Sequence, residues 1–416
     1  MKVLLAPGGL WPEPAGVPLA GSGPGLAPGH VASCLARGWR EVRPHDSLTL
    51  LPMADGGPGS AQVIAPEQVA SREVIQGRGP LGQVREVDLV RLLPKPTPFG
   101  NRRRGEASTW FLDAARLLAL PADPDEAAQE ALDGNTSGLG GVIGAALSRT
   151  GPLDTLLVGL SRSAVHDGGL GVMDALGGLR VAKDLLSRRS LGLVLADDIA
   201  LGGMNGAGAA LTRITSISPE LAQELDRRAC SRAMEVVSAA QGLDPGAVGP
   251  RRSLPVVSAL DDVGPSASEH ASNSAGNARL SASSWGTGAG GGSALVLRAL
   301  GAWVRPGARA MAEILALSDA VRGQDLVVAA WGELYDVLAD GVVGVVGQQA
   351  ASQALPCIVV CGRCAVSRGE LAAAGVTTAY GLQEAHATEP WDATDSHRLE
   401  SRLTDLGTRL ARTWSR

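Results

Sequence analysis

The chain has 416 residues, of which 45% are hydrophobic and only 3% aromatic, and its formal net charge is −5. This length is enough for two or three domains, and an acidic balance provides no basic face, so we expect no nucleic-acid partner. The absence of a signal-peptide pattern and of any run of 18 apolar residues, together with only five cysteines, predicts a cytoplasmic protein with no membrane segment and no disulfide framework.

The N-terminal third predicts two short buried strands, 3–6 and 48–51, because each is an apolar run that ends at a Pro- or Gly-rich turn. Residues 71–112 interleave Val and Leu with charged residues between turns, which favours antiparallel strands. The Ala- and Leu-rich stretch 113–150 is expected to be helical, with a break at Asp133-Gly134-Asn135.

The middle of the chain predicts two more buried strands and two helices. The strands are 155–160 and 191–195, and the helices are 171–186 and 219–241. Ser218 can cap the second of these helices and Pro219 suits its first position. Residues 245–293 are rich in Pro, Ser, Ala and Gly, so we expect a mobile loop that ends in a glycine hinge at 286–292.

From residue 294 onward, helices alternate with strands. The helices are predicted at 294–301, 308–322, 342–353 and 368–374, and the strands at 325–330 and 356–361. This alternation is typical of a parallel, doubly wound sheet. A polar, partly helical tail closes the chain.

Two loops share one pattern, in which a buried strand ends and an Asp precedes a pair of glycines. The residues are Asp55, Gly56 and Gly57 in the first loop, and Ser163, Asp167, Gly168 and Gly169 in the second. Strand ends are where α/β sheets bind ligands, glycine N–H groups can hold a phosphate or carboxylate, and Asp can hold a metal ion or take a proton. The alternative is a pair of tight turns with structural aspartates.

Three further groups of polar residues carry weaker patterns. Thr136 and Ser137 stand at a helix start, where they could bind an anion or simply cap the helix. Asp197 and its neighbour Asp198 follow a buried strand and could bind a metal ion, although adjacent side chains point apart, so at most one is expected in a site. The run Arg102–Arg104 is interpreted as a solvated hairpin tip.

The spacing Cys357-x3-Cys361-x2-Cys364 is that of radical iron–sulfur enzymes. We reject a cluster, because Ile358, Val359 and Val360 place the first two cysteines on a buried strand. Small thiols in the core are the better interpretation.

Six segments, in order, resemble the type I glycerate kinase family over about residues 1–385. They are Leu51–Gly59, Gly79–Gly82, Thr136–Gly140, Ser163–Gly171, Ser218–Asp226 and Gly286–Gly292. The resemblance implies phosphorylation of glycerate, a small hydroxy acid, from the nucleotide ATP with a divalent metal such as Mg²⁺, giving 2-phosphoglycerate in most members. A homodimer is kept as a candidate assembly.

The resemblance also implies two α/β domains with the site in the cleft between them. We expect a doubly wound, Rossmann- or flavodoxin-like domain from residues 1–62 and 286–390, an inserted mixed α/β domain from residues 63–285, and a C-terminal tail, 391–416.

The resemblance further assigns roles to individual residues. Asp167 and Asp55 would be catalytic, with Asp167 orienting or deprotonating the substrate hydroxyl and Asp55 holding metal or substrate. The residues implied to bind substrate or phosphate are Ser163, Gly168, Gly169, Gly56, Gly57, Thr136 and Ser137, and Asp197 is implied as a metal ligand.

Several family positions differ in this chain. The family's Asp-Ser-Phe-Lys-Gly after the first strand is replaced by Gly8-Gly9-Leu10-Trp11-Pro12, so a carboxylate and a Lys are lost. A family Glu is replaced by Trp331 and a family Asp by Tyr335. Because phosphoryl transfer relies on positioned cations, two hypotheses stand: a divergent kinase, or a non-catalytic relative that binds ligands or regulates.

Overall fold

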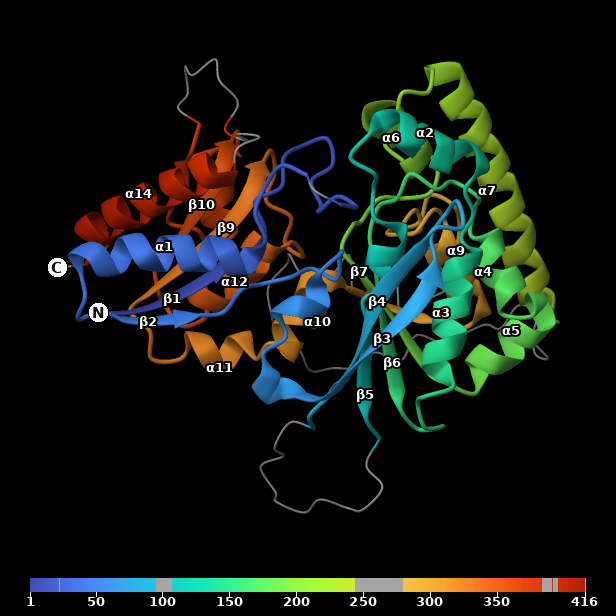
Figure 1. The fold of residues 1–416 in the computed structure, drawn as a ribbon, viewed down its shortest axis with the longest axis horizontal. Coiled ribbons are helices and arrows are strands. Elements are labelled where there is room, and N and C mark those ends of the chain that lie inside the picture. The colour runs from blue at the N-terminus through green and yellow to red at the C-terminus, as the bar shows by residue number, and fades with distance from the viewer. Residues whose placement is uncertain (22, 95–106, 244–279, 384–390, 392–395, 416) are drawn as a thin grey trace, which may run out of the picture.

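The computed structural model describes residues 1–21, 23–94, 107–243, 280–383, 391 and 396–415. The chain forms two β-sheets, each covered by helices, which make up the two halves of the molecule in Figure 1. The predicted hairpin tip at Arg102–Arg104 and most of the predicted loop 245–293 lie outside the described residues.

The first sheet contains five parallel strands in the order β11-β10-β9-β1-β2. Their bounds are β1 Lys2–Pro7, β2 Ser47–Leu50, β9 Leu326–Leu334, β10 Cys357–Cys364 and β11 Thr378–Gly381. Counted along the chain within this sheet, the order is 2-1-3-4-5, which is the flavodoxin-like order. The predicted parallel, doubly wound sheet is therefore confirmed, except that β2 is a half-exposed edge strand and not a buried one.

Helices cover both faces of this sheet. They are α1 Pro28–Val42 and α14 Ser396–Trp414 on one face, and α10 Gly307–Ile314, α11 Leu317–Val321, α12 Val342–Ala351 and α13 Arg368–Ala373 on the other. The single helix expected at 308–322 divides into α10 and α11, because Ala316 adopts a left-handed φ of 57°.

The C-terminal segment forms a full core helix and not a partly helical tail. Helix α14 lies alongside α1 (Figure 1), and Leu399, Leu403, Leu406 and Leu410 are buried in the core beneath it. The two helices meet at glycines, since a Cβ on Gly407 would lie 2.4 Å from the carbonyl oxygen of Leu35.

The second sheet has six strands in the order β3-β4-β5-β6-β7-β8. Their bounds are β3 Val69–Arg78, β4 Val84–Leu92, β5 Thr109–Leu112, β6 Thr155–Leu160, β7 Ser190–Leu195 and β8 Trp303–Pro306. Strands β3, β4 and β5 pair antiparallel, as predicted for 71–112, and β5 to β8 pair parallel.

We expected residues from 286 onward to belong with the N-terminal strand, but the structure differs for 286–306. Strand β8 pairs with β7, and helix α9 (Ser293–Leu300) buries Val296 and Leu297 in the core of the second sheet. The chain returns to the first sheet only at Gly307. The predicted glycine hinge is a buried turn, in which the N–H of Gly290 donates to the carbonyl of Ser161 at 2.8 Å.

The remaining helices surround the second sheet and the loop that leads into it. They are η1 Ser60–Val63, η2 Pro66–Gln68, η3 Ala114–Leu118, α2 Pro124–Asp133, α3 Ser137–Leu147, α4 Leu170–Ala175, α5 Gly178–Ser187, α6 Ala207–Ile214 and α7 Pro219–Gly242. Helix α7 is capped by Ser218 as predicted. The helix expected at 171–186 divides in two, because Gly177 and Gly178 both have positive φ.

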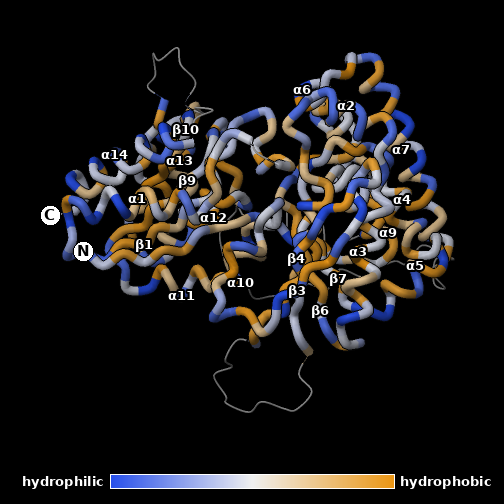
Figure 2. Tube along the Cα trace, in the orientation of Figure 1, coloured by the Kyte–Doolittle hydropathy of each residue, from blue (hydrophilic) through white to orange (hydrophobic). Residues whose placement is uncertain are grey.

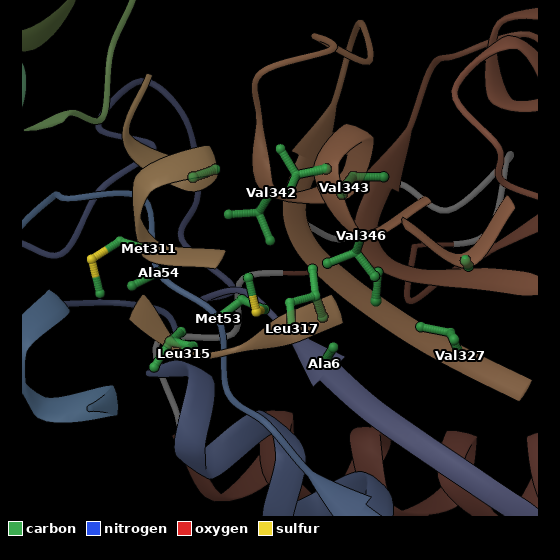
Figure 3. Close-up of a cluster of buried hydrophobic side chains, with 14 of the residues drawn as sticks. Ala6, Met53, Ala54, Met311, Leu315, Leu317, Val327, Val342, Val343 and Val346 are labelled. Atoms are coloured by element: carbon green, nitrogen blue, oxygen red, sulfur yellow. The ribbon is translucent and has the colours of Figure 1, made fainter. Parts of the chain in front are cut away.

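One apolar core joins the two sheets. It includes Met53 and Ala54 after β2, Met311 of α10, and Phe111 and Val194 from the second sheet. Figure 3 shows Met53, Ala54 and Met311 gathered with side chains of α11, α12 and β9. Figure 2 colours the chain by hydropathy and shows hydrophobic residues concentrated on the strands of both halves.

No helix among the described residues is both long and apolar enough to cross a bilayer.

Candidate functional site in the cleft between the sheets

A cavity of about 660 Å³ lies between the two sheets. On the first-sheet side it is lined by the loop after β1, by Asp55 after β2, and by the segment from Trp331 of β9 to the start of α12. On the second-sheet side it is lined by Arg162 after β6, by 195–198 at the end of β7, and by Arg213 of α6. Because these are carboxyl ends of parallel strands, the cavity occupies the place where α/β proteins bind ligands.

The lining of this cavity is strongly acidic. Among the described residues, the carboxylates that line it are Glu13, Asp55, Asp197, Asp198, Glu333, Asp336 and Asp340, and the cationic side chains are Arg162 and Arg213. An anionic substrate entering such a site would need additional positive charge to offset the repulsion.

Asp55, one of the predicted catalytic residues, lines the cavity and is half-buried. Its Oδ1 accepts a hydrogen bond of 2.9 Å from the N–H of Gly57. Burial and the charge of Asp197 raise the pKa of Asp55, whereas the Gly57 hydrogen bond and Arg162 lower it, and the net result is a pKa of about 6. A carboxyl group with this pKa can exchange a proton near neutral pH.

Gly56, directly after Asp55, is required for close packing. A Cβ on Gly56, whose φ is 90°, would lie 2.7 Å from Cγ1 of Val194 on β7. The N–H of Gly56 already donates to Oγ of Ser60 at 3.0 Å. Gly56 therefore holds the Asp55 loop against the second sheet, and its predicted role in ligand binding stays a prediction.

Arg162 and Asp197 form an ion pair in the lining of the cavity. Nε of Arg162 lies 2.6 Å from Oδ2 of Asp197, whose Oδ1 accepts from the N–H of Ile199 at 3.0 Å. Nη1 of Arg162 also donates to the carbonyl of Pro14 at 3.2 Å and lies 3.8 Å from a carboxylate oxygen of Glu13. This side chain connects the end of β6 to the loop after β1, across the cleft.

Sequence reasoning missed Arg162, although the residue stands inside the second loop that the pattern selected. The available signal was a lone Arg directly after a buried strand in a loop with a carboxylate.

Burial and the charges of Asp197 and Asp336 raise the pKa of Asp198. Since Asp336 follows β9 in the first sheet, negative charges from the two sides of the cleft face each other.

Asp167, the other predicted catalytic residue, does not line this cavity. Its Oδ2 accepts hydrogen bonds from the N–H of Thr136 at 2.9 Å, from the Oγ1–H of Thr136 at 2.8 Å and from the N–H of Gly171 at 3.1 Å. Its Oδ1 accepts a hydrogen bond from the N–H of Gly169 at 2.8 Å. Thr136 is fully buried, and its Oγ1 accepts from the N–H of Val172. The pair ties the start of α3 to the start of α4.

The other residues predicted to bind substrate or phosphate also make bonds and contacts within the chain. Oγ of buried Ser163 accepts from the N–H of Val165. A Cβ on Gly168 or Gly169 would lie 2.6 Å or 2.7 Å from a backbone carbonyl oxygen, so both positions require glycine for packing. Ser137 is exposed and donates to Asn135. Their ligand-binding roles stay predictions.

Two indole rings enclose the Gly8-Gly9 turn after β1. A Cβ on Gly8 would lie 2.7 Å from Cε3 of Trp331, and a Cβ on Gly9 would lie 2.1 Å from Nε1 of Trp11. Any larger side chain at either position would collide with a ring. The Gly8-Gly9 turn and the two indole rings therefore pack as one unit, of which Trp331 lines the cavity.

Next along the same wall, Glu333 is held by two aromatic side chains. Nε1 of Trp391 donates to its Oε1 at 3.0 Å, and the hydroxyl of Tyr335 donates to its Oε2. This bond raises the pKa of Tyr335. Arg363 lies 3.4 Å from the Tyr335 hydroxyl, so Tyr335 is fixed at the cavity although it is 52% exposed.

The described part of the chain contains no group of three or more His, Cys, Asp or Glu side chains arranged to hold a metal ion. Mg²⁺ is commonly bound by only one or two carboxylates together with substrate phosphates and water. Asp55 and Asp197 fit that requirement, because they line one cavity and the charge of Asp197 acts on the pKa of Asp55.

Comparisons with known proteins agree on one family. Residues 24–225 and 257–415 match the model of the glycerate kinase family. The chain is 27% identical to an uncharacterized protein of Mycobacterium tuberculosis over 370 residues, which cover 87% of this chain and 82% of that protein. It is 32% identical to a glycerate kinase of Bacillus subtilis over 151 residues, covering 36% of this chain and 35% of the relative.

A solved structure shows the same fold. The protein, from Salmonella typhimurium LT2 and named as a glycerate kinase 2, superposes with a TM-score of 0.61 at 21% identity, covering 99% of this chain and 98% of that one. The family model spans most of the chain, and the solved structure has the same fold. The chain belongs to the glycerate kinase family.

Proposed function

We propose that this protein is a glycerate kinase-like phosphotransferase that uses ATP to phosphorylate a hydroxyl group of glycerate or a similar small hydroxy acid. The observation that carries the proposal is the group formed by Asp55, Arg162 and Asp197 in one cavity at the strand ends. Family membership supplies the reaction class, and the cavity supplies a place for it.

Asp55 is the general base of this proposal. Its pKa of about 6 leaves it mostly ionised at neutral pH yet basic enough to accept the proton of the substrate hydroxyl as the oxygen attacks phosphorus. Arg162 and Arg213 would hold the anionic carboxylate and phosphate groups. Asp197 would hold Mg²⁺, which when bound offsets phosphate charge.

Asp167 takes a positioning role in this scheme. It does not line the cavity, and its hydrogen bonds hold the starts of helices α3 and α4. Its effect on the reaction would come through the placement of the loop that carries Arg162.

A second candidate function is a non-catalytic relative that binds a ligand or regulates. The observation that favours it is the segment Gly8–Pro12 after β1, which has no cationic side chain where the resemblance to the family places a Lys. Removing members of a cooperative catalytic unit is strongly non-additive, so the lost Lys alone could end turnover.

An ADP-release assay with Mg-ATP and D- or L-glycerate separates the two functions. For a kinase, Asp55→Asn should lower kcat by about 100-fold or more, because general-base catalysis contributes about 10²–10⁴ in rate. Asp184→Asn, at an exposed position outside the cavity lining, is the matched control and should leave kcat unchanged. Wild-type turnover no higher than that of the same mixture without protein, with ATP still bound, would instead establish the non-catalytic relative, and equal turnover of wild type and Asp55→Asn would remove Asp55 as the base.

A further inference from the structure

The direction in which successive strands are added to the first sheet reverses between β1 and β9. Open α/β sheets bind ligands at such a topological switch point. Pro7 of β1 pairs with Ala330 of β9, and that pair is the last between the two strands. Trp331 is the next residue and is paired only with Cys361 on β10. The indole therefore stands at the switch point itself.

Trp331 is held in this place by its neighbours. The N–H of Gly8 donates to the carbonyl of Ala330 at 2.9 Å, which fixes the loop after β1 against β9. The absence of a side chain at Gly8 leaves the room that the indole edge occupies. Trp331 is partly buried, packs against the core shared by the two sheets, and also lines the cavity.

The wall around Trp331 combines apolar side chains with the carboxylates Glu333, Asp336 and Asp340. Tyr335, Val337, Leu338, Val342 and Val343 line the cavity from the same side. Among the described lining residues, both cationic side chains come from the second-sheet side. The phosphates of a bound nucleotide would therefore be attracted to the second-sheet side, which leaves the indole and the apolar side chains of the first-sheet side as the place for a planar base.

We propose that Trp331 stacks on the base of the nucleotide and so directs its phosphates toward Arg162 and Arg213. This inference rests on the proposed phosphotransferase function and assigns the specificity for the nucleoside part to a residue of this chain. Stacking on an aromatic side chain stabilises a bound base to an extent that alanine substitution typically reveals as a loss of about 10- to 100-fold in affinity.

Calorimetric titration tests the inference on the full-length protein. Wild type, Trp331→Ala and Trp331→Phe are each titrated with Mg-ATP and with Mg-tripolyphosphate. We expect Trp331→Ala to weaken ATP binding by about 10- to 100-fold and to leave tripolyphosphate binding unchanged, and Trp331→Phe to stay within about 3-fold of wild type for both. Trp303→Ala, at a half-exposed indole outside this cavity, is the matched control and should keep the wild-type affinity.

Unchanged or tighter ATP binding in Trp331→Ala would overturn the stacking inference, as would equal losses for ATP and tripolyphosphate. Turnover of glycerate measured on the same proteins separates this result from the function. If the protein phosphorylates glycerate but its ATP affinity does not depend on Trp331, the proposed kinase function stands and the stacking inference fails. If its ATP affinity depends on Trp331 but glycerate is not phosphorylated, the stacking inference stands and the kinase function fails. A wild type that binds no nucleotide overturns both.

Discussion

Asp55 and Asp167 share a local structure, which explains why the sequence pattern treats them alike. In each, the carboxylate Oδ1 accepts from the N–H two residues ahead, Gly57 or Gly169, in an Asx-type turn. The difference lies in Oδ2, which in Asp167 is taken by Thr136, a residue distant in sequence. A local pattern predicts the turn but carries no information about such a partner.

A buried carboxylate outside the cavity gives a pH-dependent stability. Asp113 is fully buried, its Oδ2 accepts from the N–H of Ala61, and its Oδ1 has no partner. Burial raises its pKa to about 7, with Arg116 opposing and Asp88 adding to the shift. Because the folded pKa exceeds the unfolded one, its contribution to stability is full below about pH 4 and is lost as the pH rises through 7.

We therefore expect wild type to lose stability between pH 5 and pH 7 by about 1.4 kcal/mol per pH unit more than Asp113→Asn does. Urea unfolding of both proteins at a series of pH values measures this difference. Asp154→Asn is the control, because burial there is outweighed by hydrogen bonds from Ser108 and Gly151 that lower its pKa, so its titration lies below this range. Parallel stability curves for wild type and Asp113→Asn would contradict the prediction.

Strands and helices were predictable where burial leaves a mark in the sequence. The buried strands β6, β7 and β10 fall where apolar runs end at turns, because a strand covered on both faces has no polar positions. The four-residue strands β8 and β11 were missed, since their pairing depends on neighbours that fold from other parts of the chain. Helix α14 did carry a signal in the spacing of its buried leucines.

Helix α14 should contribute much of the stability of the first sheet. Leu403 is fully buried between α14 and the sheet. Truncating such a leucine leaves a cavity, so Leu403→Ala should lower the free energy of unfolding by about 2–5 kcal/mol. Arg409→Ala, on the exposed face of the same helix, should change it by less than about 0.5 kcal/mol. Equal effects of the two substitutions in thermal unfolding would show that α14 is not a core helix.

For the whole molecule, the sequence patterns and the family resemblance together predicted the fold class and a cleft between two domains. They predicted only some of the residues that line this cleft. Asp55 and Asp197 were predicted and line the cavity, whereas Arg162 was missed. The reason is that the two sides of the cleft are brought together by one core from both sheets. No local sequence window contains that packing.

The return of the chain from the second sheet to the first gives the sharpest test of this connection. A Cβ on Gly307, the first residue of α10, would lie 1.5 Å from the carbonyl oxygen of Asp55 and 2.7 Å from that of Leu195. Because both neighbours are backbone atoms, Gly307→Ala must shift the Asp55 loop. We expect a loss of at least about 1–3 kcal/mol in stability, and a fall of about 100-fold in kcat if Asp55 is the base.

Gly141→Ala is the matched control, since Gly141 lies within helix α3 with open space around its Cβ position. It should stabilise the protein by up to about 1 kcal/mol, because alanine favours the helix, and should leave kcat unchanged. Differential scanning calorimetry and the ADP-release assay measure both quantities on the same samples. If Gly307→Ala kept full stability and activity, then the Asp55 loop and α10 would not be in contact, and the two sheets would not be joined at this point. A loss of stability with full activity would retain the contact and remove Asp55 from the reaction.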